Sequence, residues 1–179
     1  MTWRTRASRT VYENPWIHVR EDDVTGPHGD GIYGVVRMKN AAVFVVALDD
    51  EDRVVLVAVD RYTVGLSYEV PAGGSDGEDP LVAARRELRE ETGLDAAEWT
   101  ALGRMNALNG IADAPEFVFL ARCLTAAVDA SVSQLEEGIR EIMRVPFADA
   151  LAMIRRGDIS DGETIAALAL AGIHLGRFR

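Results

Sequence analysis

Residues 78–94 read EDPLVAARRELREETGL, and this stretch carries the clearest structural signal in the chain. Pro80 stands near its start and Gly93 near its end, which is the asymmetry expected of an α-helix. Apolar residues recur at steps of three and four, at Leu81, Ala84 and Leu88. The stretch therefore predicts a helix over Pro80–Thr92 with one buried face.

Three carboxylates share one face of this predicted helix. Glu87, Glu90 and Glu91 stand at positions i, i+3 and i+4, which places their β-carbons about 5–6 Å apart. Carboxylates this close repel one another unless a cation compensates them. Mg²⁺ prefers such oxygens and keeps water molecules that a phosphate can displace, and Mn²⁺ can substitute for it. The alternative is a solvated acidic face with arginine pairs, such as Arg86 with Glu90.

The composition indicates a globular protein and excludes several classes of function. The chain has 179 residues, of which 48% are hydrophobic and 27% charged, enough for one ordinary domain. The net charge of −10 argues against nucleic-acid binding, which requires a basic surface. The single cysteine, Cys123, excludes an intrachain disulfide, and no apolar run reaches transmembrane length. We therefore expect a cytoplasmic protein that binds neither nucleic acid nor membrane.

Strands and helices alternate along the rest of the chain. Residues 1–39 contain extended segments around the turn sequence GPHGDG at 26–31, which predicts a β-hairpin. Helices are expected over Phe147–Ile154 and Glu163–Leu175, with Asp161 as the cap of the second. Further strands are expected at Ala41–Leu48, Arg53–Val59, Trp99–Met105, Glu116–Cys123 and Ile139–Val145. This pattern predicts a mixed α/β fold.

Residues 78–94 resemble the signature of the Nudix hydrolase family, E-x7-R-E-U-x-E-E-x-G-U, where U is apolar. All of these positions are matched. The signature also has a glycine six residues before its first glutamate, where this chain has Ala72, and Gly73 follows it. The loop is thus one residue shorter than usual. The sequences at Asn14–Ile17 and 69–73 resemble the ADP-ribose pyrophosphatase-like branch of the family.

This resemblance implies a particular architecture and assembly. The expected fold is the Nudix α/β/α sandwich, a mixed sheet between helices, over residues 40–179. The N-terminal β-hairpin of residues 1–39 precedes it. Because that hairpin commonly builds a swapped dimer in this branch, we expect a homodimer in which residues 1–39 serve dimerisation and contact the substrate base.

The resemblance also implies a metal site. The backbone carbonyl of Ala72 and the carboxylates of Glu87 and Glu91 match the principal ligands, and Glu90 joins them when further metal ions bind. Arg86 is expected to orient Glu90. Arg86 and Glu90 are therefore counted among the catalytic residues as well.

The resemblance also implies that the general base is a glutamate on a loop after the signature, and the matching stretch here reads QLEEG. Glu137 is the first candidate and Glu136 the second, and the neighbouring Gly138 permits the backbone to move. The other interpretation is that both glutamates belong to a solvated loop.

Three further residues are candidates for substrate binding. Arg61 follows an apolar strand and suits bidentate phosphate binding, although it could equally pair with an acid. Glu69 is expected to reach the site through metal-bound water or the substrate, or else to bond the loop backbone. Trp16 resembles an aromatic residue that stacks on the base, with packing of the hairpin onto the domain as the alternative.

Together these features predict magnesium-dependent hydrolysis of the diphosphate linkage of a nucleoside-diphosphate sugar. ADP-ribose, cleaved to AMP and ribose 5-phosphate, is the expected substrate. Residues 106–116 depart from the branch pattern, since Gly110 is followed four residues later by Ala114 and the acid appears at Glu116. Another nucleotide sugar, a dinucleotide, or a catalytically silent ligand-binding regulator are therefore the alternatives.

Overall fold

The structure, a computed structural model, describes residues 2–127 and 138–178. Its helices are α1 (Pro80–Thr92), α3 (Phe147–Arg156) and α4 (Gly162–His174). Its strands are β1 (Arg4–Glu13), β2 (Ile17–Gly26), β3 (Gly29–Met38), β4 (Ala42–Ala47), β5 (Arg53–Arg61), β6 (Gly65–Glu69), β7 (Ala72–Gly74), β8 (Leu94–Asn106), β9 (Ala112–Asp113), β10 (Pro115–Ala126) and β11 (Ile139–Pro146). No helix in these two ranges combines the length and the apolar character needed to cross a membrane.

Two sheets form the body of the molecule. One has the order β7-β4-β10-β8 and the other the order β11-β5-β6. Strand β10 runs parallel to β4 and antiparallel to β8, so the first sheet is mixed as expected. A single bridge between Leu48 and Val54 connects the sheets where the chain turns from β4 into β5.

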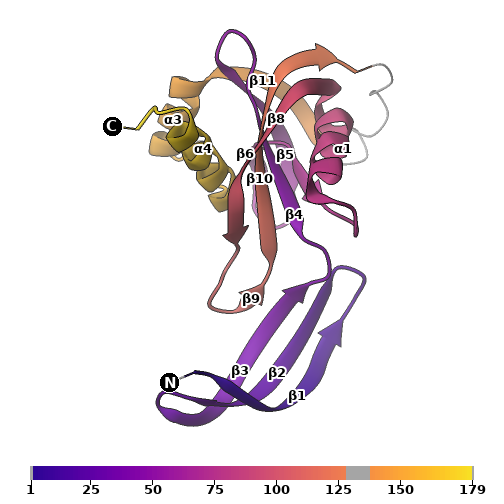
Figure 1. The fold of residues 1–179 in the computed structure, drawn as a ribbon, viewed down its shortest axis with the longest axis vertical. Helices are drawn as coiled ribbons and strands as arrows, with labels where there is room; N and C mark the ends of the chain where they lie inside the picture. Colours follow the sequence, from indigo (N-terminus) through magenta and orange to yellow (C-terminus); the bar gives the residue numbers. More distant parts are fainter. Residues whose placement is uncertain (1, 128–137, 179) are drawn as a thin grey trace.

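Helices cover both faces of β4, because alternate residues of a strand point to opposite sides. Val43 and Val45 share a buried apolar cluster with Leu88 of α1. Val46 belongs to a second cluster, which includes Leu168 of α4. Figure 1 shows α1 on one side of the strands and α3 with α4 on the other. The predicted α/β/α sandwich is confirmed.

The N-terminal strands form a larger sheet than the expected hairpin. Strands β2 and β3 pair across the predicted turn, with Gly26 opposite Gly29, and β1 adds a third strand on the other edge of β2. The side-chain oxygen of Asn14 accepts hydrogen bonds from the backbone N–H groups of Trp16 and Ile17 and so shapes the β1–β2 turn. The strands lie apart from the helical layers (Figure 1).

Besides the chain segment between β3 and β4, a short strand links this N-terminal sheet to the body. Strand β9 pairs in parallel with β3, with Val36 opposite Ala112 and Arg37 opposite Asp113. The backbone N–H of Val36 also donates to the carbonyl of Ile111 at 2.9 Å. Since β9 leads directly into β10, the N-terminal sheet is tied to a strand at the centre of the body.

Helix α1 has the limits that its sequence predicts. The side chain of Asp79 accepts a hydrogen bond from the backbone N–H of Leu81 at the N-terminus. Gly93 ends the helix in a left-handed conformation with a φ of 69°, which glycine adopts without strain. The predicted helix over Pro80–Thr92 is confirmed residue by residue.

Candidate functional site

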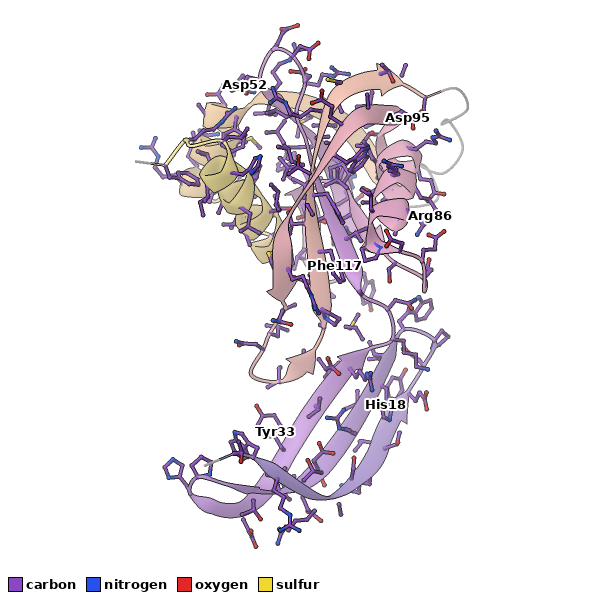
Figure 2. All side chains as sticks on the ribbon, viewed as in Figure 1. His18, Tyr33, Asp52, Arg86, Asp95 and Phe117 are labelled. Atoms are coloured by element: carbon purple, nitrogen blue, oxygen red, sulfur yellow. The ribbon has the colours of Figure 1, made fainter. Side chains whose placement is uncertain are left out.

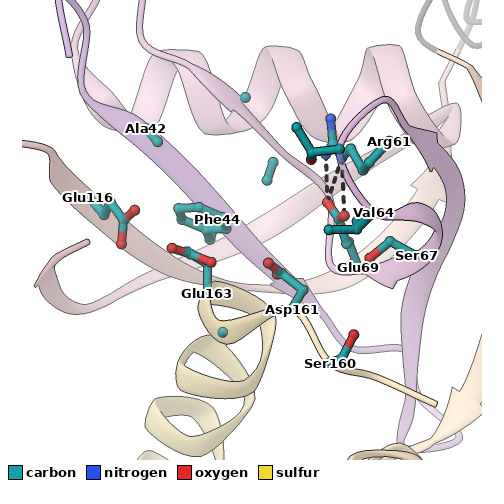
Figure 3. A pocket seen from close by; sticks show the side chains of 14 residues that line it. Ala42, Phe44, Arg61, Val64, Ser67, Glu69, Glu116, Ser160, Asp161 and Glu163 are labelled. Carbon is teal, nitrogen blue, oxygen red and sulfur yellow. Dashed lines mark hydrogen bonds and ion pairs between the residues drawn. The ribbon is translucent and has the colours of Figure 1, made fainter. Parts of the chain in front are cut away.

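A cavity of about 490 Å³ lies between the start of β4, strand β7, the β5–β6 turn, β10 and the start of α4 (Figure 3). Three of the residues predicted to act in the site line it, namely Arg61, Glu69 and Ala72. Gly73 and the aromatic ring of Phe44 lie among the other lining residues. Residues from four regions of the sequence therefore meet at one hollow.

The carboxylates of α1 lie directly behind the wall formed by β7. Glu87 and Glu91 are each 5% exposed. Glu91 accepts a hydrogen bond of 2.9 Å from the backbone N–H of Ala72. A Cβ added to Gly73 would overlap the carboxylate of Glu87, so only glycine leaves room for that side chain. Gly73 stands one position later than the glycine of the family signature. Its lack of a side chain allows the backbone of β7 to lie this close to Glu87.

Arg86 connects the predicted metal ligands to one another. Its guanidinium donates to Glu87 at 2.8 Å, to Glu90 at 3.1 Å and to Glu78 at 3.0 Å. It also donates to the backbone carbonyl of Gly74 at 2.9 Å. Burial opposes the charge of Arg86, but the bonds to these glutamates outweigh it and raise the pKa of the guanidinium. The predicted pairing of Arg86 with Glu90 is confirmed.

The chemistry of the donors suits a hard divalent cation. The carboxylate of Glu91 bonds the backbone of Ala72, and that of Glu87 lies against Gly73. Both Glu87 and Glu90 accept hydrogen bonds from Arg86. Magnesium prefers carboxylate and carbonyl oxygens as ligands. Within residues 2–127 and 138–178, however, no three His, Cys, Asp or Glu side chains converge closely enough to hold a metal ion. The guanidinium of Arg86 contributes positive charge among the carboxylates in this arrangement.

Arg61 and Glu69, both predicted to bind substrate, form an ion pair at the cavity wall. The Nη2 and Nε atoms of Arg61 donate to the Glu69 carboxylate at 2.5 Å and 3.1 Å. This bond, which outweighs the effect of burial, raises the pKa of Arg61. Glu69 is 7% exposed. It pairs with the side chain of Arg61, whereas the alternative interpretation of the sequence expected it to bond the backbone of the loop. Figure 3 shows the pair at the opposite end of the cavity from Glu116.

That far wall is acidic, and sequence reasoning did not assign it a role. Glu116 of β10 lines the cavity together with Asp161 and Glu163 at the start of α4. Burial raises the pKa of Glu116 to about 7, and the negative charges of Glu163 and Asp161 act in the same direction. The available signal was a glutamate at the head of the apolar strand segment 117–121.

The remaining predicted residues lie elsewhere. Trp16 is 70% exposed and does not line the cavity. Its expected alternative role, packing the hairpin onto the domain, is wrong for this chain because most of the side chain faces solvent. Glu136 and Glu137 lie outside the described residues.

Comparison with known proteins gives this arrangement a family. The Nudix domain family matches residues 38–168. The chain belongs to the Nudix family. A second family model, the nucleoside diphosphate sugar hydrolase N-terminal domain, matches residues 3–36, which comprise β1, β2 and most of β3.

Individual relatives cover nearly the whole chain. An ADP-ribose pyrophosphatase of Mycobacterium tuberculosis is 33% identical over 96% of this chain and 81% of its own length. An ADP-ribose pyrophosphatase of Bacillus subtilis is 30% identical over 92% of this chain and 90% of its own length. A crystal structure described as an ADP compounds hydrolase shares the fold with a TM-score of 0.82 over 99% of this chain and 98% of its own, at 22% identity. The predicted Nudix family and its ADP-ribose pyrophosphatase-like branch are confirmed, and the chain is a Nudix hydrolase.

Proposed function

We propose that this Nudix hydrolase cleaves the diphosphate linkage of a nucleoside-diphosphate sugar with the help of Mg²⁺, and that ADP-ribose is its substrate. The observation that carries the proposal is the contact between α1 and β7. Glu91 binds the backbone of Ala72, which itself lines the cavity, so the signature helix and the cavity share one wall. Mn²⁺ is the expected substitute for Mg²⁺.

The proposed metal ligands are the Ala72 carbonyl, Glu87, Glu91 and, for a further ion, Glu90. When bound, a divalent cation neutralises phosphate oxygens and lowers the pKa of an attacking water. Gly73 provides the space that the Glu87 carboxylate occupies. Arg86 fixes the orientation of Glu87 and Glu90 through its bonds at 2.8 and 3.1 Å.

Arg61 is the proposed phosphate-binding residue. Its side chain is partly exposed at the cavity wall, and a guanidinium can donate two parallel hydrogen bonds to a phosphate. Glu69 restricts the guanidinium to one orientation through the ion pair, which reduces the entropy lost when phosphate binds. We propose that Glu69 acts on the substrate through Arg61.

The reaction itself is a hydrolysis at phosphorus. The oxygen of one water molecule forms a bond to a phosphorus of the diphosphate, and the bridging P–O bond breaks. The leaving phosphate keeps the electron pair of that bond, while the proton of the water passes to a general base. With ADP-ribose the products are AMP and ribose 5-phosphate. Glu137 is the proposed base, with Glu136 as the second candidate.

We further propose that residues 1–39 form a dimerisation unit next to a hydrolase domain of residues 40–179. Every residue of β1 is exposed, so this strand has no cover within one chain. Large apolar side chains are exposed on the same sheet and in its β1–β2 turn, namely Val11, Tyr12, Trp16 and Ile32. Surface of this kind favours association with a second copy, and Trp16 would then be available to a substrate base. A location in the cytoplasm agrees with the single cysteine.

A substrate screen tests the proposed function. Purified protein is incubated with Mg²⁺ and ADP-ribose, GDP-mannose, UDP-glucose or a diadenosine polyphosphate, and the products are identified by mass spectrometry. Reaction in ¹⁸O-labelled water shows which phosphorus is attacked. We expect AMP and ribose 5-phosphate from ADP-ribose, no turnover after chelation, and recovery with Mg²⁺ or Mn²⁺. Turnover of another sugar alone would correct the substrate, and binding without any turnover would identify a regulator.

A further inference from the structure

Glu116 is a carboxylate at the cavity wall to which no described residue supplies a hydrogen bond or an ion pair. The side chain is 6% exposed, and no hydrogen bond or ion pair to it occurs within residues 2–127 and 138–178. No side-chain oxygen of the described residues is both fully buried and without a hydrogen-bond partner, so the Glu116 oxygens are open to the cavity. Figure 3 shows this carboxylate pointing toward Phe44 and Glu163. A ligand that fills the cavity would desolvate this carboxylate, which is costly unless the ligand supplies hydrogen-bond donors.

The residues nearest to Glu116 increase this cost. Glu163 and Asp161 act on it with negative charge, and both lie at the start of α4. Asp161 is committed to the helix, since it accepts a hydrogen bond of 2.7 Å from the backbone N–H of Thr164. The nearest predicted cationic residue of the cavity, Arg61, is already paired with Glu69. No described side chain therefore supplies the donors that Glu116 lacks.

Glu116 and Glu163 also stand where two cavities meet. Both residues line the polar cavity of about 490 Å³ and a second one of about 310 Å³. The second cavity is mostly apolar and lies between β3 and the segment before β10, with Val36, Met38, Leu108 and Ile111 in its wall. In a nucleotide sugar, hydroxyl-bearing rings lie directly beside the diphosphate. The position of Glu116 thus matches a sugar ring of a molecule whose diphosphate lies near Arg61.

We propose that Glu116, supported by Glu163, accepts hydrogen bonds from a vicinal diol of the substrate. The two oxygens of a carboxylate can accept from two adjacent hydroxyl groups, which supplies the missing donors. The same wall repels an anionic group, so it favours an uncharged sugar over one that carries a carboxylate or phosphate. This inference rests on the proposed function and specifies how that site distinguishes its substrates.

The raised pKa of Glu116 agrees with an uncharged ligand. With a pKa of about 7, the group carries only part of its charge at neutral pH, and a hydroxyl can pair with either protonation state. The diol can belong to the nucleoside ribose or to the terminal sugar, since both rings carry adjacent hydroxyl groups. Binding experiments separate these two sources.

The experiment uses analogues in which a methylene group replaces the bridging oxygen of the diphosphate, so that they bind without turnover. Isothermal titration in Mg²⁺ compares the analogues of ADP-ribose, ADP and 2′,3′-dideoxy-ADP. The guanine and uracil series, with mannose and glucose as the terminal sugars, are measured in parallel. The ratio of Kd between the ADP and ADP-ribose analogues reports the contribution of the terminal sugar to affinity. The ratio between the 2′,3′-dideoxy-ADP and ADP analogues reports the contribution of the nucleoside ribose.

We expect the wild-type protein to show a ratio of at least about tenfold in one of these comparisons, the effect of hydrogen bonds to a charged group. Glu116→Leu should reduce that ratio to about one, and Glu116→Gln, which keeps one acceptor, should reduce it less. Glu98→Leu is the control, because Glu98 is an exposed glutamate on β8 opposite Arg122. Circular dichroism verifies that each variant is folded.

The inference is wrong if Glu116→Leu keeps both ratios, if the wild-type protein shows neither ratio, or if no series binds. Hydrolysis of ADP-ribose by the wild-type protein is measured separately. If that hydrolysis is absent while a ratio dependent on Glu116 is present, the proposed function fails and the diol site remains. If hydrolysis is present without a ratio that depends on Glu116, the proposed function stands and the diol site is wrong.

Discussion

The molecule contains two acidic regions, and the carboxylates in these regions differ in the partners that the protein gives them. On α1, Glu87 and Glu90 are bonded to Arg86, and Glu91 is bonded to the backbone of Ala72. On the far wall, Glu116 has no such partner in the described chain, and its nearest charged neighbours are acids. The carboxylates of α1 are therefore held in place by the protein itself, whereas no described residue holds Glu116, for which we have proposed a ligand diol as the partner.

We relate this difference to two separate roles, the catalytic step and the discrimination between substrates. A group that takes part in every turnover must keep one geometry before the substrate arrives, because misplacement reduces the rate steeply. A group that distinguishes substrates is more effective when only the correct substrate relieves its cost of burial, since a wrong one then leaves it unpaired. We expect substitutions on α1 to change kcat and substitutions on the far wall to change relative affinities.

The largest effect is expected for Glu91→Gln. This change keeps the size of the side chain and removes the charge that a divalent cation requires, so turnover should fall at least about hundredfold. The fold should persist, because glutamine can still accept the hydrogen bond from Ala72. Steady-state kinetics with ADP-ribose and a thermal melt measure the two properties. Near-normal hydrolysis would remove Glu91 from the proposed ligands.

Gly73→Ala tests the close packing behind the cavity wall. The added methyl group would displace the Glu87 carboxylate, which lies at the end of a flexible side chain, so the loss of stability should be small. Turnover should nevertheless fall about 10–100-fold, as for changes that disturb the position of a metal ligand. Gly74→Ala is the matched control, because its Cβ meets only Asp76, at 3.3 Å. Equal activities of the two variants would contradict this role of Gly73.

Glu137→Gln tests the proposed general base, which the described residues do not include. Turnover should fall at least about tenfold, since glutamine cannot take a proton from water. The fall should be largest in kcat, with KM little changed. Glu136→Gln serves as the comparison. If only that variant loses activity, the base is Glu136, and if neither does, the base lies elsewhere.

The smallest effect concerns stability and pH. The pKa of Glu116 is raised from an ordinary value of 4.5 to about 7 in the folded state, so the folded protein holds this proton to higher pH than the unfolded chain does. The contribution of Glu116 to the free energy of unfolding should therefore fall as pH rises from about 4.5 to about 7. In urea denaturation across this pH range, the free energy of unfolding should decline less steeply with pH for Glu116→Leu than for the wild type. An unchanged decline, equal to that of Glu98→Leu, would falsify the assignment.

Local sequence signals predicted one part of the fold accurately. Pro80 and Gly93 mark both ends of α1 as predicted, and helix ends depend on residues that are close in sequence. Asp161 likewise caps α4 as expected, through its bond to the backbone of Thr164. The helical spacing also predicted the pairing of Arg86 with Glu90, which the structure contains.

Features that depend on distant partners were not predictable in this way. Strand β7 was not among the predicted strands, and it exists because Gly73 pairs with Val43 of β4. Residues 1–39 were expected to form a hairpin, and β1 was not foreseen as a separate third strand because the turn at Asn14 depends on side-chain hydrogen bonds. Glu116 gained its significance only when the fold placed it beside Glu163 of α4.

The two residue pairs between β3 and β9 have a consequence for the N-terminal sheet. Because Val36 and Met38 of that sheet also form part of the apolar cavity next to Glu116, the sheet is a wall of the binding region within a single chain. Removal of residues 1–39 would therefore do more than delete the proposed dimerisation unit. It would also remove one wall of the apolar cavity beside Glu116.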